Sequence, residues 1–105
     1  MRNVIILHAN GERTEYPQKT RPSYEFLRKL VDGPAELIPD FNKFEGRSCV
    51  VYCNELGKLQ LLPRNEEATK SWRVFLDSTK RPYAADRATL VGTVVIIQKM
   101  KGELK

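Results

Sequence analysis

The chain is poor in the side chains that most often carry catalysis or bind metal ions. It has one histidine, His8, and two cysteines, Cys49 and Cys53, in 105 residues. No zinc-ligand spacing, Gly-x-Ser-x-Gly, P-loop or Gly-x-Gly-x-x-Gly motif is present. His8 follows a predicted strand and lies beside a turn, where we expect a structural or solvent-facing role. We therefore predict no catalytic residue, no cofactor and no metal site, and the inventory argues against an enzyme.

Long apolar runs are also missing. No stretch approaches 18 apolar residues, and no apolar segment with a charged start and a cleavage site opens the chain. We expect a soluble, unsecreted, cytoplasmic protein with no membrane contact. Cys49 and Cys53 lie about 13 Å apart on one predicted strand, too far to form a disulfide. Both are expected to be small buried apolar residues, which suits a reducing compartment.

Positive charge is in excess, and its distribution is uneven. The formal net charge is +5; residues 1–60 carry 9 basic against 8 acidic side chains, and residues 61–105 carry 9 against 5. The basic surplus is therefore in the second half of the chain. It is compatible with an anionic partner, but a charge of this size also simply keeps a small protein soluble.

The most informative stretch is a predicted hairpin. Residues 49–53 are β-branched, aromatic or small, which favours a strand. Residues 54–57 suit a type I turn whose last residue, glycine, takes a positive φ. Residues 58–62 would form the second strand, ended by Pro63, and Asn65 is the expected N-cap of a following helix.

The N-terminal region predicts a second hairpin. Residues 4–8 are apolar on both faces, as in an interior strand. Asn10-Gly11 favours a type I′ turn, in which both central residues have positive φ. Residues 13–16 are polar enough for an edge strand, and we expect Pro17 to end it.

Two helices and three further segments complete the prediction. Ser23 caps a helix through Val31, which Gly33 closes at its C′ position. A longer helix covers residues 66–77, with Lys70, Arg73 and Asp77 on its outer face. The remaining predicted segments are a short strand over residues 35–38, a polar excursion over residues 78–88 and a central strand over residues 90–98.

The loop over residues 40–46 contains Phe41 and Phe44. We expect their rings to fold back as a lid on the core; the alternative is an exposed aromatic pair at a binding site. Together the elements predict one domain, residues 1–105, of the α+β class. It is a mainly antiparallel sheet of about six strands with two packed helices.

Two sets of polar residues are candidate sites. The first is Asn54 and Glu55 at the predicted hairpin tip with Arg64 and Asn65 before the second helix, where free N–H groups favour an anion. Turn formation and capping explain the two asparagines without a ligand. The second set offers charges to phosphates and a ring for stacking, although interspersed acidic residues also suit a solvated surface. It consists of Lys70, Arg73, Lys80, Arg81, Tyr83 and Arg87.

Five segments, spread over nearly the whole chain, form a distinctive combination. They are Val31-Asp32-Gly33 with Glu36, residues 50–59, Leu62-Pro63-Arg64-Asn65, Ala68-Thr69, and residues 91–96. The combination resembles an uncharacterised family of small proteins, a domain of unknown function, encoded by bacteriophages, plasmids and some large DNA viruses. The most specific part is the Asn-Glu-x-Gly-Lys-Leu turn followed by Leu-Pro-x-Asn.

The resemblance implies an origin rather than a reaction. A small accessory protein of a virus or mobile element is expected to bind a host protein or a small anionic ligand, and so to modulate a host enzyme or counter a defence system. A nucleic-acid-binding protein that uses the basic second half is the alternative. The oligomeric state, monomer or homo-oligomer, is left open by the sequence.

Overall fold

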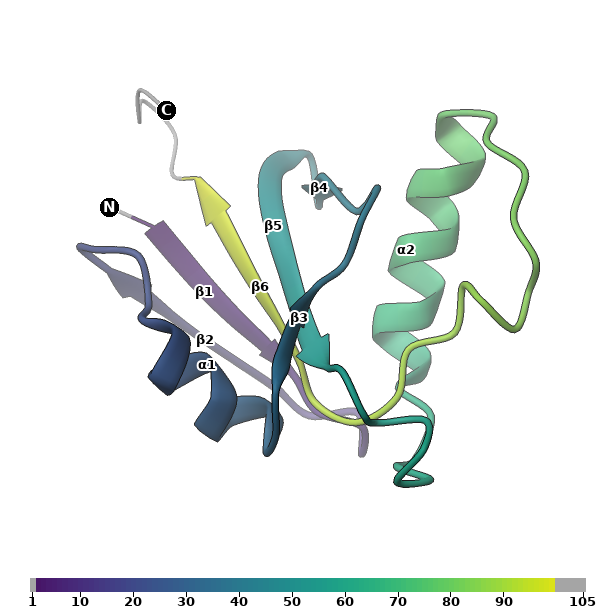
Figure 1. Cartoon of the computed structure of the whole chain (residues 1–105). Helices are drawn as coiled ribbons and strands as arrows, with labels where there is room; N and C mark the ends of the chain where they lie inside the picture. The colour runs from purple at the N-terminus through teal and green to yellow at the C-terminus, as the bar shows by residue number, and fades with distance from the viewer. Residues whose placement is uncertain (1, 100–105) are drawn as a thin grey trace.

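The computed structural model describes residues 2–99 and shows an antiparallel sheet between two helices (Figure 1). The strands follow the order β2-β1-β6-β5-β3. β4 is outside this order and pairs with the first residues of β5. The α+β fold with six strands and two helices is therefore confirmed for the described residues. The elements are β1 (Arg2–Leu7), β2 (Arg13–Gln18), α1 (Tyr24–Val31), β3 (Ala35–Leu37), β4 (Lys43–Phe44), β5 (Arg47–Asn54), α2 (Glu66–Ser78) and β6 (Val94–Lys99).

The core has two parts, one on each face of the sheet. Alternate residues of β1 point to opposite faces, so that Ile5 packs under α2 and Val4 packs under α1. β6 lies between β1 and β5, and its residues from Val94 to Gln98 are all buried. The prediction of a central last strand is confirmed, although the strand begins at Val94 rather than at residue 90.

The prediction that residues 58–62 form the second strand of a central hairpin is wrong. After β5 the chain forms consecutive turns over residues 55–61. β5 pairs instead with β6 along one edge, and with β3 and β4 on its remaining positions. A strand has only two edges, so no pairing position was left for residues 58–62. Gly57 does not take a positive φ; glycine is needed because a Cβ there would lie 2.8 Å from Cγ2 of Val91.

The first hairpin forms, but its turn differs from the prediction. Leu7 pairs with Arg13, so the connection has five residues, and of the Asn10-Gly11 pair only Gly11 has a positive φ. The turn is therefore not type I′. Pro17 lies inside β2 instead of ending it, because β2 is an edge strand and an edge position does not require the missing N–H.

The first helix begins where the sequence predicts and ends differently. Ser23 caps α1 by accepting a hydrogen bond from the Phe26 amide. The left-handed residue at the C-terminus is Asp32, with φ 60°, and not Gly33. Gly33 is required for space, because a Cβ on it would lie 2.6 Å from Nδ2 of Asn54.

The aromatic residues of the 40–46 loop fill the space between α2 and the sheet. Phe41 is 1% exposed and Phe44 is 4% exposed. The Phe41 ring lies parallel to that of Trp72, with centroids 6.3 Å apart, and the indole donates a hydrogen bond to the Asp40 carbonyl. The predicted lid on the core is confirmed, and the alternative of an exposed aromatic pair is wrong.

Candidate functional site

Asn54 supports the structure from inside. It is buried, and its Nδ2 donates to the carbonyl oxygens of Val31 at 3.2 Å and Asp32 at 3.1 Å, and to Oε1 of Gln60 at 3.3 Å. Its Oδ1 accepts from the Leu56 amide at 2.8 Å. The side chain therefore joins the end of α1 to the turns after β5. These bonds give its polar atoms partners within the fold, and a contact of Asn54 with a ligand or partner stays a prediction.

Asn65 plays the same part at the other end of these turns. It is fully buried, and its Nδ2 donates to the carbonyl oxygens of Leu7 and Gly92, both at 2.8 Å. Its Oδ1 accepts from the Ala68 amide, which confirms the predicted N-cap of α2. The Asn65 side chain is thus fully engaged within the fold, and its contact with a ligand stays a prediction.

The other two residues of the first predicted set, Glu55 and Arg64, lie on the surface. Arg64 forms an ion pair with Glu66, with Nε and Oε2 3.1 Å apart, and its backbone bridges to Val91. Glu55 lines the edge of a small cavity that Arg87 also lines. The four residues thus divide into two internal supports and two exposed side chains that flank the same segment.

That segment, residues 55–62, is named the leucine loop here because of its exposed leucines. Leu59 is 83% exposed and Leu61 is 88% exposed. Leu61 also has φ 56°, a left-handed conformation that costs a residue with a Cβ roughly 1–2 kcal/mol. The surrounding structure therefore holds the backbone so that both side chains face solvent. The sequence analysis predicted a strand for residues 58–62 and gave no sign of this surface.

Several hydrogen bonds brace the leucine loop. Three backbone hydrogen bonds of 2.9 to 3.1 Å form along it. The Gly57 amide donates to the Asn54 carbonyl, the Gln60 amide to the Leu56 carbonyl and the Leu62 amide to the Gly57 carbonyl. Nζ of Lys58 donates to the Asp86 carbonyl at 2.9 Å, which ties the loop to the excursion after α2. The two leucines are thus presented by a shaped turn.

The second predicted set does not form one surface. Arg73 is turned inward, and its guanidinium donates to the Ala88 carbonyl at 3.1 Å, the Ala85 carbonyl at 2.5 Å and Oγ1 of Thr89 at 3.0 Å. It therefore holds residues 85–89 against α2. Arg73 is therefore half-buried and not on a simply solvated outer face as predicted, and its contact with an anion stays a prediction.

Three members of that set do come together. Arg81, Tyr83 and Arg87 line a cavity of about 450 Å³ beside Trp72. Arg81 is paired with Asp40, with Nη1 and Oδ1 2.9 Å apart. The ion pair with Asp40 neutralises the charge of Arg81. Lys70 lies on the opposite side of α2 and lines the groove described next. Lys80 follows the end of α2 with a positive φ and does not line this cavity.

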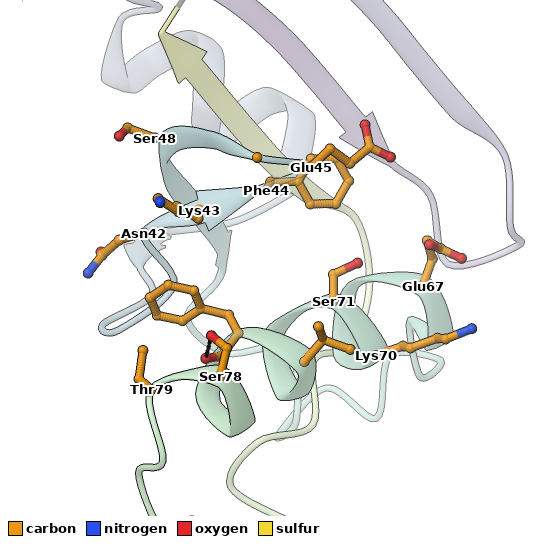
Figure 2. A pocket seen from close by; sticks show the side chains of 13 residues that line it. Asn42, Lys43, Phe44, Glu45, Ser48, Glu67, Lys70, Ser71, Ser78 and Thr79 are labelled. Carbon is orange, nitrogen blue, oxygen red and sulfur yellow. Dashed lines mark hydrogen bonds between the residues drawn. The ribbon is translucent and has the colours of Figure 1, made fainter.

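The largest cavity is a groove of about 640 Å³ between α2 and the hairpin of β4 and β5 (Figure 2). Val74 and Phe75 from the helix and Phe44 from the hairpin provide its apolar lining. Lys43 from the hairpin and Lys70 from the helix stand on its two sides (Figure 2), and within residues 2–99 neither amine has a hydrogen-bonding or ionic partner. The groove therefore combines an apolar surface with two cations and with two carboxylates, those of Glu45 and Glu67.

The two cysteine thiols are withdrawn from solvent. Burial raises the pKa of the Cys49 thiol to about 12 and that of the Cys53 thiol to about 11, so both are protonated at neutral pH. Both cysteines are free, as expected. Nε2 of His8 is hydrogen bonded to Oγ1 of Thr14 at 3.2 Å. No group of three metal-binding side chains occurs among residues 2–99.

Comparison with known proteins gives no further guide, because no protein-family model, no curated protein and no solved structure matches the chain. The resemblance to the phage and plasmid family stays a prediction. No helix within residues 2–99 is long and apolar enough to cross a membrane. Function must therefore be argued from the surfaces of the chain itself.

Proposed function

We propose that the chain is a non-enzymatic accessory protein of a virus or mobile element, and that it binds a host protein through the leucine loop. The observation that carries the proposal is the exposure of Leu59 and Leu61 on a braced turn. Removing an exposed leucine side chain from water is favourable by about 1.5–3 kcal/mol. The backbone of the turn is already braced, so it loses little conformational freedom when a partner covers the two side chains.

The shape and the surroundings of the loop indicate the kind of partner. Side chains that project from a turn fit a concave apolar surface, so the partner would supply the pocket. The exposed charges of Glu55 and Arg64 lie at the two ends of the loop. Polar residues around an apolar centre are the usual arrangement at protein interfaces. In this proposal Glu55 and Arg64 set the orientation of the partner, and the leucines supply most of the affinity.

The test is affinity capture from a lysate of the cells in which the chain is naturally made. The unmodified chain, the double variant Leu59→Ser/Leu61→Ser and the control variant Leu37→Ser are compared quantitatively. Leu37 is 52% exposed on the edge strand β3 and is not part of the loop. We expect one or more proteins to be retained by the first and third chains and lost from the double variant. If all three retain the same proteins, the proposal is wrong.

A second measurement separates a host protein from a second copy of the chain. Sedimentation equilibrium of the purified protein reports its self-association. We expect Leu59→Ser/Leu61→Ser to leave the measured mass unchanged. A dimer that the double variant abolishes would assign the loop to self-association and contradict the host-protein proposal.

The groove beside α2 supports a second candidate function, the binding of a small anionic ligand. Its apolar lining suits the body of an organic molecule, and the amines of Lys43 and Lys70 suit an acidic group on it (Figure 2). Both lysines lack a partner within residues 2–99. Glu45 and Glu67 line the groove too, so the acidic group of such a ligand would bind at the lysines and its uncharged part along the apolar lining.

Native mass spectrometry of the protein as purified tests this candidate. We expect an additional mass that is released on denaturation and absent from the Lys43→Gln/Lys70→Gln variant. The matched control is Lys80→Gln, which removes an exposed lysine that does not line the groove. Retention of the same mass by the groove variant, or a bare chain in every sample, would contradict a ligand in the groove.

A further inference from the structure

The cavity of about 450 Å³ beside Trp72 combines two aromatic rings with charged side chains. It is bounded by α2, by the turn at residues 39–40 and by the excursion over residues 81–88. Trp72 comes from the helix and Tyr83 from the excursion. The remaining apolar lining consists of Pro39, Leu76, Pro82, Ala84 and Ala88. A mainly apolar cavity of this size with a few charged groups is the usual form of a small-ligand site.

The indole of Trp72 is a fixed aromatic platform in this cavity. The Phe41 ring lies parallel to it, with ring centroids 6.3 Å apart, and its Nε1 donates a hydrogen bond to the Asp40 carbonyl at 3.1 Å. The indole is nevertheless only half-buried, and it lines the cavity. Because its orientation is already set, a planar ligand that stacks on it costs little conformational freedom.

The excursion that supplies the second ring is held against α2. The guanidinium of Arg73 donates hydrogen bonds to the carbonyls of Ala85 and Ala88. The hydroxyl of Tyr83 interacts with Asp77 on the helix, while the Tyr83 side chain as a whole is 38% exposed. The cavity therefore has a second aromatic ring that is anchored and still accessible to a ligand.

The charged groups that line the cavity leave one positive charge in excess. Asp40 and Arg81 form an ion pair, with Oδ1 and Nη1 2.9 Å apart. The guanidinium of Arg87 has no hydrogen-bonding or ionic partner within residues 2–99. Arg87 also lines the adjoining small cavity together with Glu36 and Glu55, and it forms an ion pair with neither of them. One guanidinium is therefore available to an acidic group of a ligand.

We infer that this cavity binds a nucleotide unit, with the base stacked on Trp72 and Tyr83 and the phosphate at Arg87. Aromatic side chains stack on bases of any sequence, and a guanidinium matches the geometry of a phosphate. Positive charge around the cavity favours a phosphate, because residues 79–88 carry three basic side chains and one acidic side chain. The sequence analysis had included Tyr83 and Arg87 among the anion contacts but not Trp72.

The site is separate from both surfaces discussed under the proposed function. It shares no lining residue with the groove beside α2, and none with the leucine loop. The chain has a single tryptophan, so its fluorescence reports on this cavity. The experiment therefore titrates the purified chain with AMP and follows the emission of Trp72, with calorimetry as a second readout.

We expect AMP to quench the tryptophan emission in a saturable way, because the base stacks on the indole. Ribose 5-phosphate, which lacks the base, should leave the emission unchanged. Adenosine, which lacks the phosphate, should quench it with a lower affinity than AMP. Saturable quenching by AMP that is matched by heat in the calorimeter supports the site.

Two variants assign the contacts. Arg87→Gln should lower the affinity for AMP at least about tenfold, through loss of a charge-assisted hydrogen bond, and leave the affinity for adenosine unchanged. Tyr83→Ala should lower the affinity for both compounds about tenfold. The matched controls are Arg47→Gln, an exposed arginine outside the cavity, and Phe26→Ala, a ring on α1 that is 37% exposed. Both controls should bind as the unmodified chain does.

The nucleotide site is overturned if AMP gives neither saturable quenching nor heat. It is also overturned if Arg87→Gln or Tyr83→Ala binds AMP as tightly as the unmodified chain. Circular dichroism verifies that each variant is folded.

The source of the nucleotide is distinguished by a short single-stranded oligonucleotide of adenosines. Tighter binding of the strand than of AMP, with an affinity that falls steeply with salt and is weakened by Arg87→Gln, assigns a nucleotide within a nucleic acid. Binding of AMP at least as tightly as the strand assigns a free nucleotide. Oligonucleotide binding that Arg87→Gln and Tyr83→Ala both leave unchanged would contradict the site.

Discussion

Two loops of this protein contain apolar residues and use them in opposite ways. The loop over residues 40–46 buries Phe41 and Phe44 between α2 and the sheet. The leucine loop turns Leu59 and Leu61 outward instead. Apolar residues in a loop are therefore not a sign of function by themselves. What decides is whether another element covers the loop.

The surroundings of the two loops explain the difference. α2 faces the first loop with Ala68 and Trp72, and the small alanine side chain leaves room for aromatic rings. The leucine loop follows the end of β5 and projects beyond the sheet, and no helix covers it (Figure 1). Its ends are held by Asn54 and Asn65, so the leucines cannot simply fold back onto the core.

The largest expected effect comes from removing the buried aromatic residue. Phe41→Ala should lower the free energy of unfolding by about 3–5 kcal/mol, because it leaves a cavity beside Trp72. Leu59→Ala should change it by less than about 0.5 kcal/mol, as is usual for exposed sites. Urea denaturation measures both. Equal changes in the free energy of unfolding for the two substitutions would show that the two loops do not differ in the burial of their apolar residues.

Next in size is the loss of the support beneath the leucine loop. Asn54→Ala should cost about 2 kcal/mol, because it leaves the Leu56 amide and the carbonyls at the end of α1 without a partner. Hydrogen exchange should accelerate at the amides of Gly57 and Gln60. The control, Asn42→Ala, alters an exposed asparagine in the other loop. Unchanged exchange in Asn54→Ala would show that the loop is braced by its backbone alone.

The backbone of the leucine loop predicts opposite signs for neighbouring glycine substitutions. Leu61→Gly should raise the free energy of unfolding by about 0.5 kcal/mol, because relief of the left-handed strain exceeds the entropy that glycine adds to the unfolded chain. Leu59→Gly should lower it by about 0.5–1 kcal/mol, since φ is not positive there. Differential scanning calorimetry provides the comparison. A loss of stability in both variants would contradict the assigned strain.

The smallest effect concerns the charged tip of the first loop. Oε1 and Oε2 of Glu45 accept hydrogen bonds from Arg13 at 2.8 and 2.9 Å, and these lower the pKa of Glu45 below the ordinary 4.5. The contact therefore stabilises the fold at pH values above the ordinary pKa of Glu45. This stabilisation is lost as the pH falls through the lowered pKa of the folded state. Glu45→Gln should cost about 0.5 kcal/mol at neutral pH, because the pair is partly exposed.

In strongly acidic solution, Glu45→Gln and the unmodified chain should be equally stable. The control is Glu67→Gln, which removes an exposed carboxylate that forms no ion pair within residues 2–99. A difference that persists at low pH would mean that the Glu45 side chain acts through packing.

Much of the fold follows from local sequence chemistry. The β-branched residues of β6 favour a strand covered on both sides, and Ser23 and Asn65 mark the starts of the two helices. The candidate site could be predicted less completely from the sequence. Both asparagines were singled out by their turn and capping chemistry, but nothing local shows that Asn65 reaches the carbonyl of Leu7, 58 residues away.

The sequence alone determined the class of the fold, the starts of its helices and the burial of its aromatic loop, because propensity, capping and apolar spacing act between near neighbours. The tertiary structure decided the rest. Residues 58–62 became a loop because both edges of β5 were already paired. Arg2 and Lys99 met because β1 and β6 are antiparallel neighbours. Contacts between distant segments depend on which strand edges and faces are occupied, and local residue patterns do not encode that.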